Sequence, residues 1–405
     1  MKIAISLTKM SLGGGTKSTL ILGTYLASQG HDVTIVTERK GEWWSELSSY
    51  GLQGCCIPYP RWSSRVRRAE LLAQYWNTQG FDQVIINVPL HKPSVYACHM
   101  LEDRVGVLFI LRSDWRPWYE LAHRDQAYWN CAVGVSPKVE KGLAAHCPGK
   151  PVFYIPNGVA SPSDQELESR LGWEQPLRLI WVGRLVDNQK GIFRLPLILS
   201  RCQQKQIPVT LTIVGDGPDR APLVRLFKKY GVYDQVTLVG PQGLSQIPAL
   251  MRQHHILLFP SNIEGLPNVV LEAMANGCVP IASFLLDITT AAIEHDRTGI
   301  LLEPTNISGF VDGIQFMRDP KAWRRMSAAG AEQMRLQFPL KKTGEQYETL
   351  LVQMQNGAYP VQRPYNQQPS RRAIPFHWSD HLPTLPEFAK NQARHLRHRM
   401  GHLMK

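Results

Sequence analysis

The sequence predicts an α/β protein built from two Rossmann-like domains that face each other across a cleft. Short apolar runs alternate with stretches of helical periodicity in the first half of the chain, and the second half repeats this series. At 405 residues the chain is also too long for one ordinary domain. Alternating strands and helices indicate parallel sheets with helices on both faces, and such sheets bind ligands beyond the carboxyl ends of their strands.

Six strands are predicted in the first half of the chain. The apolar runs that predict them are Lys2–Leu7, Asp32–Thr37, Gln83–Val88, Val105–Leu111, Cys131–Val135 and Val152–Ile155. Helical periodicity over Thr16–Gln29 follows the first strand and ends at Gly30, a residue typical of helix C-termini. A strand is preferred over a signal peptide at the N-terminus because the apolar run is short and no small-residue cleavage site follows it.

The second half repeats this plan. Its predicted strands are Leu177–Val182, Val209–Val214, Gln235–Val239, Ile256–Phe259, Val279–Ala282 and Ile300–Leu302. Helices are predicted between them over Asp219–Tyr230, Leu244–Gln253 and Pro267–Asn276. The repeat is one of architecture, since the two halves share no recognisable sequence repeat.

The join between the halves is expected within residues 155–173, where a polar run separates IPNGV from the next strand. Helical periodicity returns over Lys341–Met354. After Gly357 the chain becomes rich in Pro and Gln without any period, which is typical of a linker or mobile tail. The expected division is therefore 1–158, 159–340, a helix over 341–356 and a basic tail over 357–405.

Composition narrows the class of protein. Hydrophobic residues make up 43% and charged residues 19% of the chain, as in globular proteins. Apolar runs stay far below the roughly 18–20 residues that a membrane helix needs. The seven cysteines follow no metal or disulfide spacing, which favours a reducing, cytoplasmic compartment. The sequence lacks an Asp-x-Asp motif, so neither a metal nor another cofactor is expected.

The first candidate motif is SLGGGTKST, directly after the first predicted strand. Gly13, Gly14 and Gly15 allow the backbone to turn tightly and to approach a ligand closely, and the following helix N-terminus attracts anions. The motif differs from a P-loop because Thr16 precedes the lysine where glycine is required. A plain strand–helix turn is the alternative.

The second motif combines Gly183 and Arg184 with Lys190, just after the strand Leu177–Val182. Two cations at the carboxyl end of a strand suit a diphosphate, whose charge needs fixed partners. A solvated basic loop is the alternative.

The third motif is EGLPNVVLEAMANG, in which eight positions separate Glu264 from Glu272. Pro267 is favoured at a helix start, which places Glu264 at the helix mouth and Glu272 in its second turn. The two carboxylates are then suited to different parts of one ligand, the first to a reacting centre and the second to a ribose. Spacing alone favours the alternative that Glu272 is an ordinary acidic residue on the helix surface.

Together these motifs resemble glycosyltransferase family 4, the retaining type of the two-domain GT-B fold, over residues 1–355. The Glu-x7-Glu pair is the most specific part, and VGDGP and IPNGV match a glycine-rich turn and the segment entering the linker. The resemblance implies that Glu264 contacts the donor sugar, Glu272 the ribose, and Arg184 with Lys190 the diphosphate. It further implies a donor site made of Gly13, Gly14, Gly15, Gly183, Gly215, Gly217, Pro218, Gly265, Leu266, Asn268, Val269 and Glu272.

The resemblance also implies an activity. Residues 159–340 would bind a nucleotide-diphosphate sugar such as a UDP- or GDP-sugar, and residues 1–158 would lie on the acceptor side. The expected reaction is retaining, metal-independent transfer to a glycan or lipid-linked glycan in polysaccharide biosynthesis. The alternatives are a nucleotide-sugar epimerase or phosphorylase, and a non-catalytic relative that binds a nucleotide sugar or partners an active enzyme.

One departure concerns Arg112, which follows the strand Val105–Leu111 where the family often carries a histidine. Arginine cannot act as a general base, but it can hydrogen-bond a sugar hydroxyl or an anionic acceptor. We therefore expect Arg112 in the active site, and the substitution leaves acceptor and sugar identity open. Asn87 occupies another such loop position, and its role stays open.

The net charge of +12 is concentrated in two segments. Arg61, Arg65, Arg67 and Arg68 surround Trp62, and residues 371–405 hold seven lysines and arginines against two acids. A solvated basic surface is the simplest interpretation of these segments, and contact with an anionic membrane surface is the functional alternative. Nucleic acid is not an expected partner because no recognised binding motif accompanies the charge.

Overall fold

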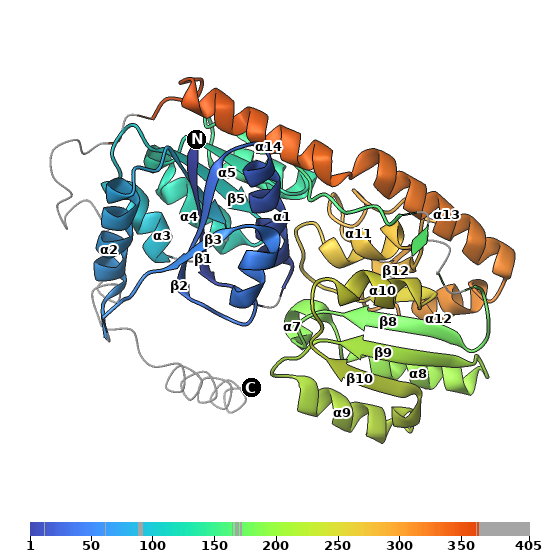
Figure 1. Cartoon of the computed structure of the whole chain (residues 1–405). Helices are drawn as coiled ribbons and strands as arrows, with labels where there is room; N and C mark the ends of the chain where they lie inside the picture. The colour runs from blue at the N-terminus through green and yellow to red at the C-terminus, as the bar shows by residue number, and fades with distance from the viewer. Residues whose placement is uncertain are drawn as a thin grey trace.

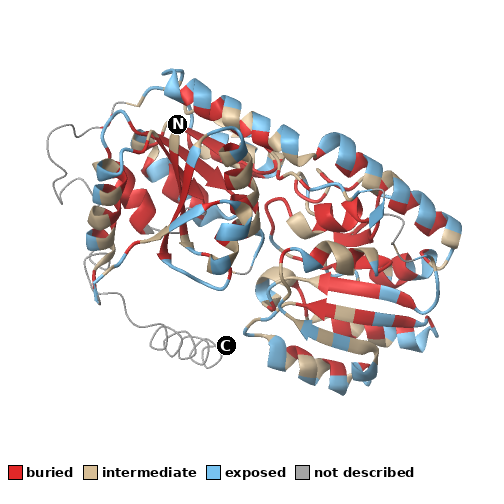
Figure 2. Ribbon diagram, in the orientation of Figure 1, coloured by how far each residue is buried: buried red, intermediate tan, exposed pale blue. Residues whose placement is uncertain are grey.

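The computed structural model describes residues 1–363, apart from 12, 61, 88–91, 164, 167–169, 171 and 362. It contains two α/β domains, each with its own parallel sheet (Figure 1). The predicted fold of two Rossmann-like domains is confirmed. In Figure 2 the buried residues follow the strands, while the outer helices alternate buried and exposed faces.

The first sheet has the strand order β3-β2-β1-β4-β5-β6-β7, and all its pairs are parallel. Its strands are β1 (Lys2–Lys9), β2 (Asp32–Arg39), β3 (Gln53–Cys56), β4 (Gln83–Asn87), β5 (Gly106–Leu111), β6 (Cys131–Gly134) and β7 (Val152–Tyr154). The chain leaves β1 on one side towards β2 and returns on the other to β4. This reversal opens a crevice beyond the carboxyl end of β1, where ligands bind in such sheets.

The sequence did not predict β3. Its four residues include Gly54, and they pair in parallel with residues 34–37 of β2. A Cβ atom on Gly54 would lie 2.5 Å from Leu47 Cδ1, so this edge strand depends on a close approach that local periodicity does not reveal.

The helices of the first domain cover both faces of its sheet. They are α1 (Gly14–Ser28), α2 (Arg65–Thr78), α3 (Lys92–Ala97), α4 (Arg116–Arg124) and α5 (Pro137–His146), with 3₁₀ turns η1 (Trp44–Tyr50), η2 (Cys98–Met100) and η3 (Gln126–Tyr128). Among the described residues, no helix is long and apolar enough to cross a membrane.

The second sheet has the order β10-β9-β8-β11-β12-β13 and is also parallel. Its strands are β8 (Leu177–Val182), β9 (Val209–Val214), β10 (Val236–Gly240), β11 (Ile256–Phe259), β12 (Val279–Ser283) and β13 (Ile300–Leu302). Its helices are α7 (Asp187–Lys190), α8 (Arg194–Gln204), α9 (Arg220–Lys229), η4 (Tyr233–Gln235), α10 (Gln246–Arg252), α11 (Asn268–Ala275), α12 (Ile307–Phe316) and α13 (Pro320–Gln337). The order reverses between β8 and β11, so α7 and α11 flank the crevice.

Helix α14 (Leu340–Gln355) continues from α13 and returns to the first domain, where it packs on α1 and β5 (Figure 1). Glu348 accepts one hydrogen bond from the Tyr25 hydroxyl, and its Oε1 lies 3.3 Å from His31 Nε2. A Cβ atom on Gly344 would lie 2.3 Å from the Tyr25 ring, so the close approach of α14 to α1 requires glycine there.

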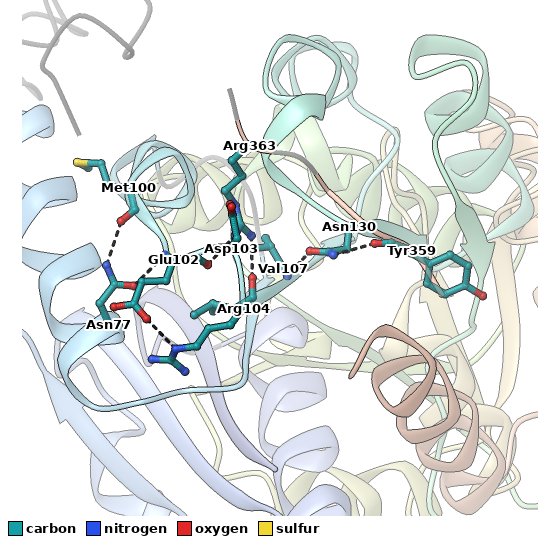
Figure 3. A network of polar contacts seen from close by, with 10 residues as sticks. Asn77, Met100, Glu102, Asp103, Arg104, Val107, Asn130, Tyr359 and Arg363 are labelled. Carbon is teal, nitrogen blue, oxygen red and sulfur yellow. Dashed lines mark hydrogen bonds and ion pairs between the residues drawn. The ribbon is translucent and has the colours of Figure 1, made fainter. Parts of the chain in front are cut away.

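The chain stays on the first domain after α14. Arg363 is 5% exposed, and its guanidinium donates to the carbonyls of Glu102 and Val105 at 2.7 Å (Figure 3). Asn130 donates to the carbonyl of Tyr359 and accepts from the backbone of Val107. The first residues of the predicted tail are therefore fixed near the amino end of β5, opposite the cleft, and residues 364–405 lie outside the described part.

Candidate active site

The crevices of the two sheets meet at the N-termini of α1 and α11. Asn268, the first residue of α11, donates from Nδ2 to the carbonyl of Gly14 at 3.0 Å and to Ser18 Oγ at 2.8 Å. A Cβ atom on Gly14 would lie 3.4 Å from the same amide nitrogen. The predicted glycine loop and the predicted donor helix are thus in direct contact across the domain interface.

Both helix N-termini are suited to an anion. Neither α1 nor α11 has a side-chain cap or an acidic residue in its first turn. The first backbone N–H groups of a helix have no partner within it, and the helix dipole adds positive potential there. Gly13 and Gly14 are exposed and Gly15 is half-buried at the start of α1. Two helix N-termini that each suit a phosphate are thus in contact here.

Lys190 reaches this place from the second domain. Its Nζ lies 2.6 Å from Glu264 Oε1, and both side chains are largely buried. Gly191 ends α7 in the left-handed conformation with φ 60°, and a Cβ atom there would lie 2.1 Å from the carbonyl oxygen of Pro260. Asp187 fixes the turn by accepting from the backbone of Phe193. The turn therefore holds Lys190 in one position beside Glu264.

Arg184 follows β8 on the same side of the sheet. Its side chain is exposed, in contrast to Lys190. Of the two predicted diphosphate cations, Lys190 is thus fixed by an ion pair, while Arg184 lies in the loop that begins at Gly183.

The glycine-rich turn after β9 interlocks with that loop. A Cβ atom on Gly215 would lie 1.9 Å from the carbonyl oxygen of Gly183, and one on Gly217 would lie 2.4 Å from that of Leu185. The backbone of Leu185 donates to the carbonyl of Asp216 at 3.0 Å. The predicted glycines therefore let two loops touch through their backbones, and Pro218 is exposed beyond them.

Glu272 is buried, so the surface-acid reading of this residue is wrong. Its side chain lies 3.0 Å from Lys17 Nζ, which comes from α1 of the other domain. Burial raises the pKa of Glu272, and the Lys17 ammonium opposes that rise. Lys17 was not among the predicted site residues, although its place one turn into a helix that begins at the predicted glycine loop could have indicated it.

The loop before α11 rests on the first domain. Gly265 lies so close to Arg112 that a Cβ atom would be 2.2 Å from the Arg112 carbonyl oxygen. The backbone of Asp114 donates to the carbonyl of Glu264 at 3.0 Å, and Asn157 Nδ2 donates to that of Leu266 at 3.1 Å. Val269 is half-buried in the first turn of the helix. The loop that carries Glu264 is therefore positioned by both domains.

Comparison with known families decides the class of this chain. The family model described as "Glycosyltransferase Family 4" matches residues 12–161, and "Glycosyl transferases group 1" matches residues 163–333. The chain belongs to the family 4 type of glycosyltransferases. The resemblance on which the sequence analysis relied is thereby confirmed.

Individual relatives of this glycosyltransferase match over shorter segments. N-acetyl-alpha-D-glucosaminyl L-malate synthase of Bacillus anthracis is 32% identical over 146 residues, which are 36% of this chain and 38% of that protein. Alpha-D-kanosaminyltransferase of Streptomyces kanamyceticus is 26% identical over 182 residues, 45% and 47% of the two chains. The matched segments thus span less than half the length of these relatives.

Solved structures match over almost their whole length and show the GT-B fold. Anabaena HepE in complex with UDP and glucose has a TM-score of 0.74 at 18% identity, covering 87% of this chain and 99% of that one. Sucrose-phosphate synthase of Thermosynechococcus elongatus has a TM-score of 0.72 at 20% identity, with 88% and 99% covered.

Arg112, which was expected in the active site, is held between two asparagines. Its Nε donates to Asn87 Oδ1 at 2.6 Å and its Nη1 to Asn157 Oδ1 at 2.7 Å. Burial lowers the pKa of the Arg112 guanidinium. Burial of the Tyr347 hydroxyl likewise raises the pKa of that group to about 12. Two donor groups of the guanidinium are thus used inside the protein, where Arg112 ties the end of β4 to the segment that enters the linker. Its expected contact with an acceptor stays a prediction.

Proposed function

We propose that this protein transfers a sugar from a nucleotide-diphosphate sugar to an acceptor with retention of anomeric configuration. The observation that carries the proposal is the meeting of the α1 and α11 N-termini beside Lys190, Glu264 and Glu272. Charge that develops on a leaving diphosphate needs fixed donors, and this place combines helix N-termini with cations from the protein.

The cations have a defined task in this proposal. Lys190 and Arg184 follow β8 and neutralise the diphosphate as the sugar–phosphate bond breaks. Lys190 is paired with Glu264 before the donor binds, so the diphosphate takes up a cation that is already oriented. The exposed Arg184 closes on the phosphate from the solvent side.

The two carboxylates act on different parts of the donor. Glu264 lies at the mouth of α11, where it orients the sugar through its hydroxyl groups rather than attacking it. Glu272 lies one turn further into the helix and accepts hydrogen bonds from the ribose. The retaining course and this division come from the family resemblance, and the helical spacing is compatible with both.

No divalent metal is needed in this mechanism, because protein cations perform its charge neutralisation. The absence of an Asp-x-Asp motif from the sequence supports this.

A glycan or lipid-linked glycan, bound by the first domain, is the acceptor class in this proposal. The basic residues of α2 and the chain after residue 363 would bring the enzyme to the inner face of an anionic membrane. HepE was solved with UDP and glucose, which makes UDP-sugars the first donors to test.

The deciding experiment is a thermal-shift screen of UDP-, GDP- and ADP-sugars, followed by turnover of each binding donor with and without candidate acceptors. A ligand at 100 times its dissociation constant adds about 2.7 kcal/mol of stability. Transfer to an acceptor supports the proposal. Binding without turnover would favour the non-catalytic relative, conversion to an isomeric nucleotide sugar would favour the epimerase, and no binding would reject a donor site.

A further inference from the structure

The buried ion pair between Lys17 and Glu272 joins the two domains where the proposed function places the ribose. Lys17 lies one turn into α1 and Glu272 one turn into α11, and their charged atoms are 3.0 Å apart. The two side chains are only 17% and 10% exposed. Charges so far removed from water are costly unless they stay paired, so this contact is sensitive to the loss of either partner.

A second ion pair crosses the same interface but lies in solvent. Lys141 of α5 is 2.8 Å from Asp287, and these side chains are 66% and 32% exposed. Exposed pairs contribute little because water and salt screen them. Lys141 is therefore a matched control for Lys17: the same residue type, the same kind of partner and the same interface, at a different depth.

The contacts around Lys17 exist only when the domains are together. Asn268 of the second domain donates to Gly14 and Ser18 of the first, which holds the first turns of α11 and α1 against each other. Lys17 reaches across this junction to Glu272 Oε1. Separation of the domains would break all three interactions at once.

Glu272 also keeps a free side for a ligand. Lys17 contacts Oε1, and within the described part of the chain Oε2 takes no hydrogen bond from a side chain. An ionised carboxylate can accept several hydrogen bonds, so the ammonium group and a ribose hydroxyl do not compete for one lone pair. Burial favours the protonated form of Glu272, and the nearby ammonium group favours the ionised form that accepts from two hydroxyls.

We infer that Lys17 is a positioning residue that couples binding of the donor's nucleoside diphosphate to closure of the two domains, because it holds Glu272 in place for the ribose. This inference rests on the proposed function. Lys17 acts through Glu272, so its effect on binding depends on the presence of that carboxylate.

The test measures the dissociation constants of UDP and GDP by calorimetry on the full chain. Lys17→Met should weaken binding of the preferred nucleotide about tenfold, Lys17→Arg no more than about threefold, and Lys141→Met less than twofold. In a Glu272→Gln background the further loss caused by Lys17→Met should disappear, since the two residues form one unit. A structural defect would instead weaken binding equally in both backgrounds.

A second readout needs no donor. The radius of gyration of the free chain in solution scattering should increase in Lys17→Met but not in Lys141→Met, with circular dichroism confirming that both variants fold. Equal nucleotide affinity of Lys17→Met and the wild type would overturn the inference about Lys17 but not the proposed function. An equal loss of affinity with and without Glu272 would do the same. A wild-type chain that binds no nucleoside diphosphate overturns the proposed function, and the coupling fails with it.

Discussion

Lys190 Nζ lies 2.6 Å from Glu264 Oε1, although the two residues follow different strands and are 74 positions apart. The pair is largely buried, and both partners belong to loops at the carboxyl edge of the second sheet. A cation and a carboxylate that share this place can serve neighbouring parts of one ligand. Lys190 faces the diphosphate and Glu264 the sugar in the proposed mechanism.

Replacement of the two cations should slow turnover. Removal of one preorganised donor to developing charge costs about 10²–10³-fold, and we expect Lys190→Ala and Arg184→Ala each to fall in that range at saturating donor. Arg184→Lys should stay impaired because an ammonium group cannot reproduce the planar two-point fork. The double variant should be less than additive, as both groups serve one diphosphate.

Thermal denaturation distinguishes the two variants further. Lys190→Ala leaves Glu264 buried without its cation and should lower the melting temperature, whereas the exposed Arg184 can be removed at little cost. Near-wild-type turnover in both single variants would contradict the assignment of the diphosphate site.

The two glutamates should have different kinetic signatures. Glu264→Gln should reduce kcat strongly with a modest change in donor affinity, because its contacts strengthen as the sugar moves towards the transition state. Glu272→Gln should mainly raise KM for the donor, because ribose contacts are equal in the ground and transition states. Initial rates over a range of donor concentrations measure both. Indistinguishable profiles for the two variants would refute the division.

Much of the fold could be predicted because its strands are buried apolar runs. Leu177–Val182, Val209–Val214, Ile256–Phe259 and Ile300–Leu302 were predicted with the bounds that the structure has. Ile256–Phe259 is a central parallel strand covered on both faces, so its sequence is continuously apolar. The edge strand Gln53–Cys56 was missed, since its pairing depends on tertiary contacts rather than on periodicity.

The site could be predicted only where its residues lie close in sequence. The spacing of Glu264 and Glu272 placed the first at the mouth of a helix and the second in its second turn, and the structure has them so. The partner of Glu272 could not be predicted, because Lys17 reaches it only through the way the two domains meet. The contacts of Arg112 with Asn87 and Asn157 could not be predicted either, because they join residues far apart in the sequence.

Arg363 holds the chain after α14 on the first domain, so the tail beyond it can be removed without loss of this contact. Arg363→Ala should destabilise the chain by about 1–3 kcal/mol, because two buried carbonyls lose their donor. A chain ending at Arg363 should keep this stability and its nucleotide affinity but bind anionic vesicles more weakly, at about 1 kcal/mol for each lost cation near the surface. Equal vesicle binding by the two chain lengths would remove the tail from the membrane contact.

Chelation should leave activity unchanged. In the proposed mechanism Lys190 and Arg184 perform the charge neutralisation that a divalent ion performs in other transferases, so exhaustive EDTA treatment should not reduce the initial rate. The measurement compares treated enzyme with and without added magnesium or manganese. An activity that disappears with EDTA and returns with either ion would show that the mechanism needs a metal.

The return of α14 to the first domain can be tested with two glycines in helix interiors. Alanine is the better helix former, so Gly→Ala in an exposed helix stabilises by up to about 1 kcal/mol. Gly330 of α13 is buried, but an added Cβ atom would lie 3.4 Å from its nearest neighbour, an ordinary van der Waals contact, so Gly330→Ala should keep most of this gain. At Gly344 the added atom would lie 2.3 Å from the Tyr25 ring, so Gly344→Ala should destabilise by about 1–3 kcal/mol. Denaturant unfolding of the two variants measures the contrast. If Gly344→Ala were as stable as Gly330→Ala, the close packing of α14 on α1 would be wrong, and the contact of Glu348 with Tyr25 and His31 would have to be abandoned with it.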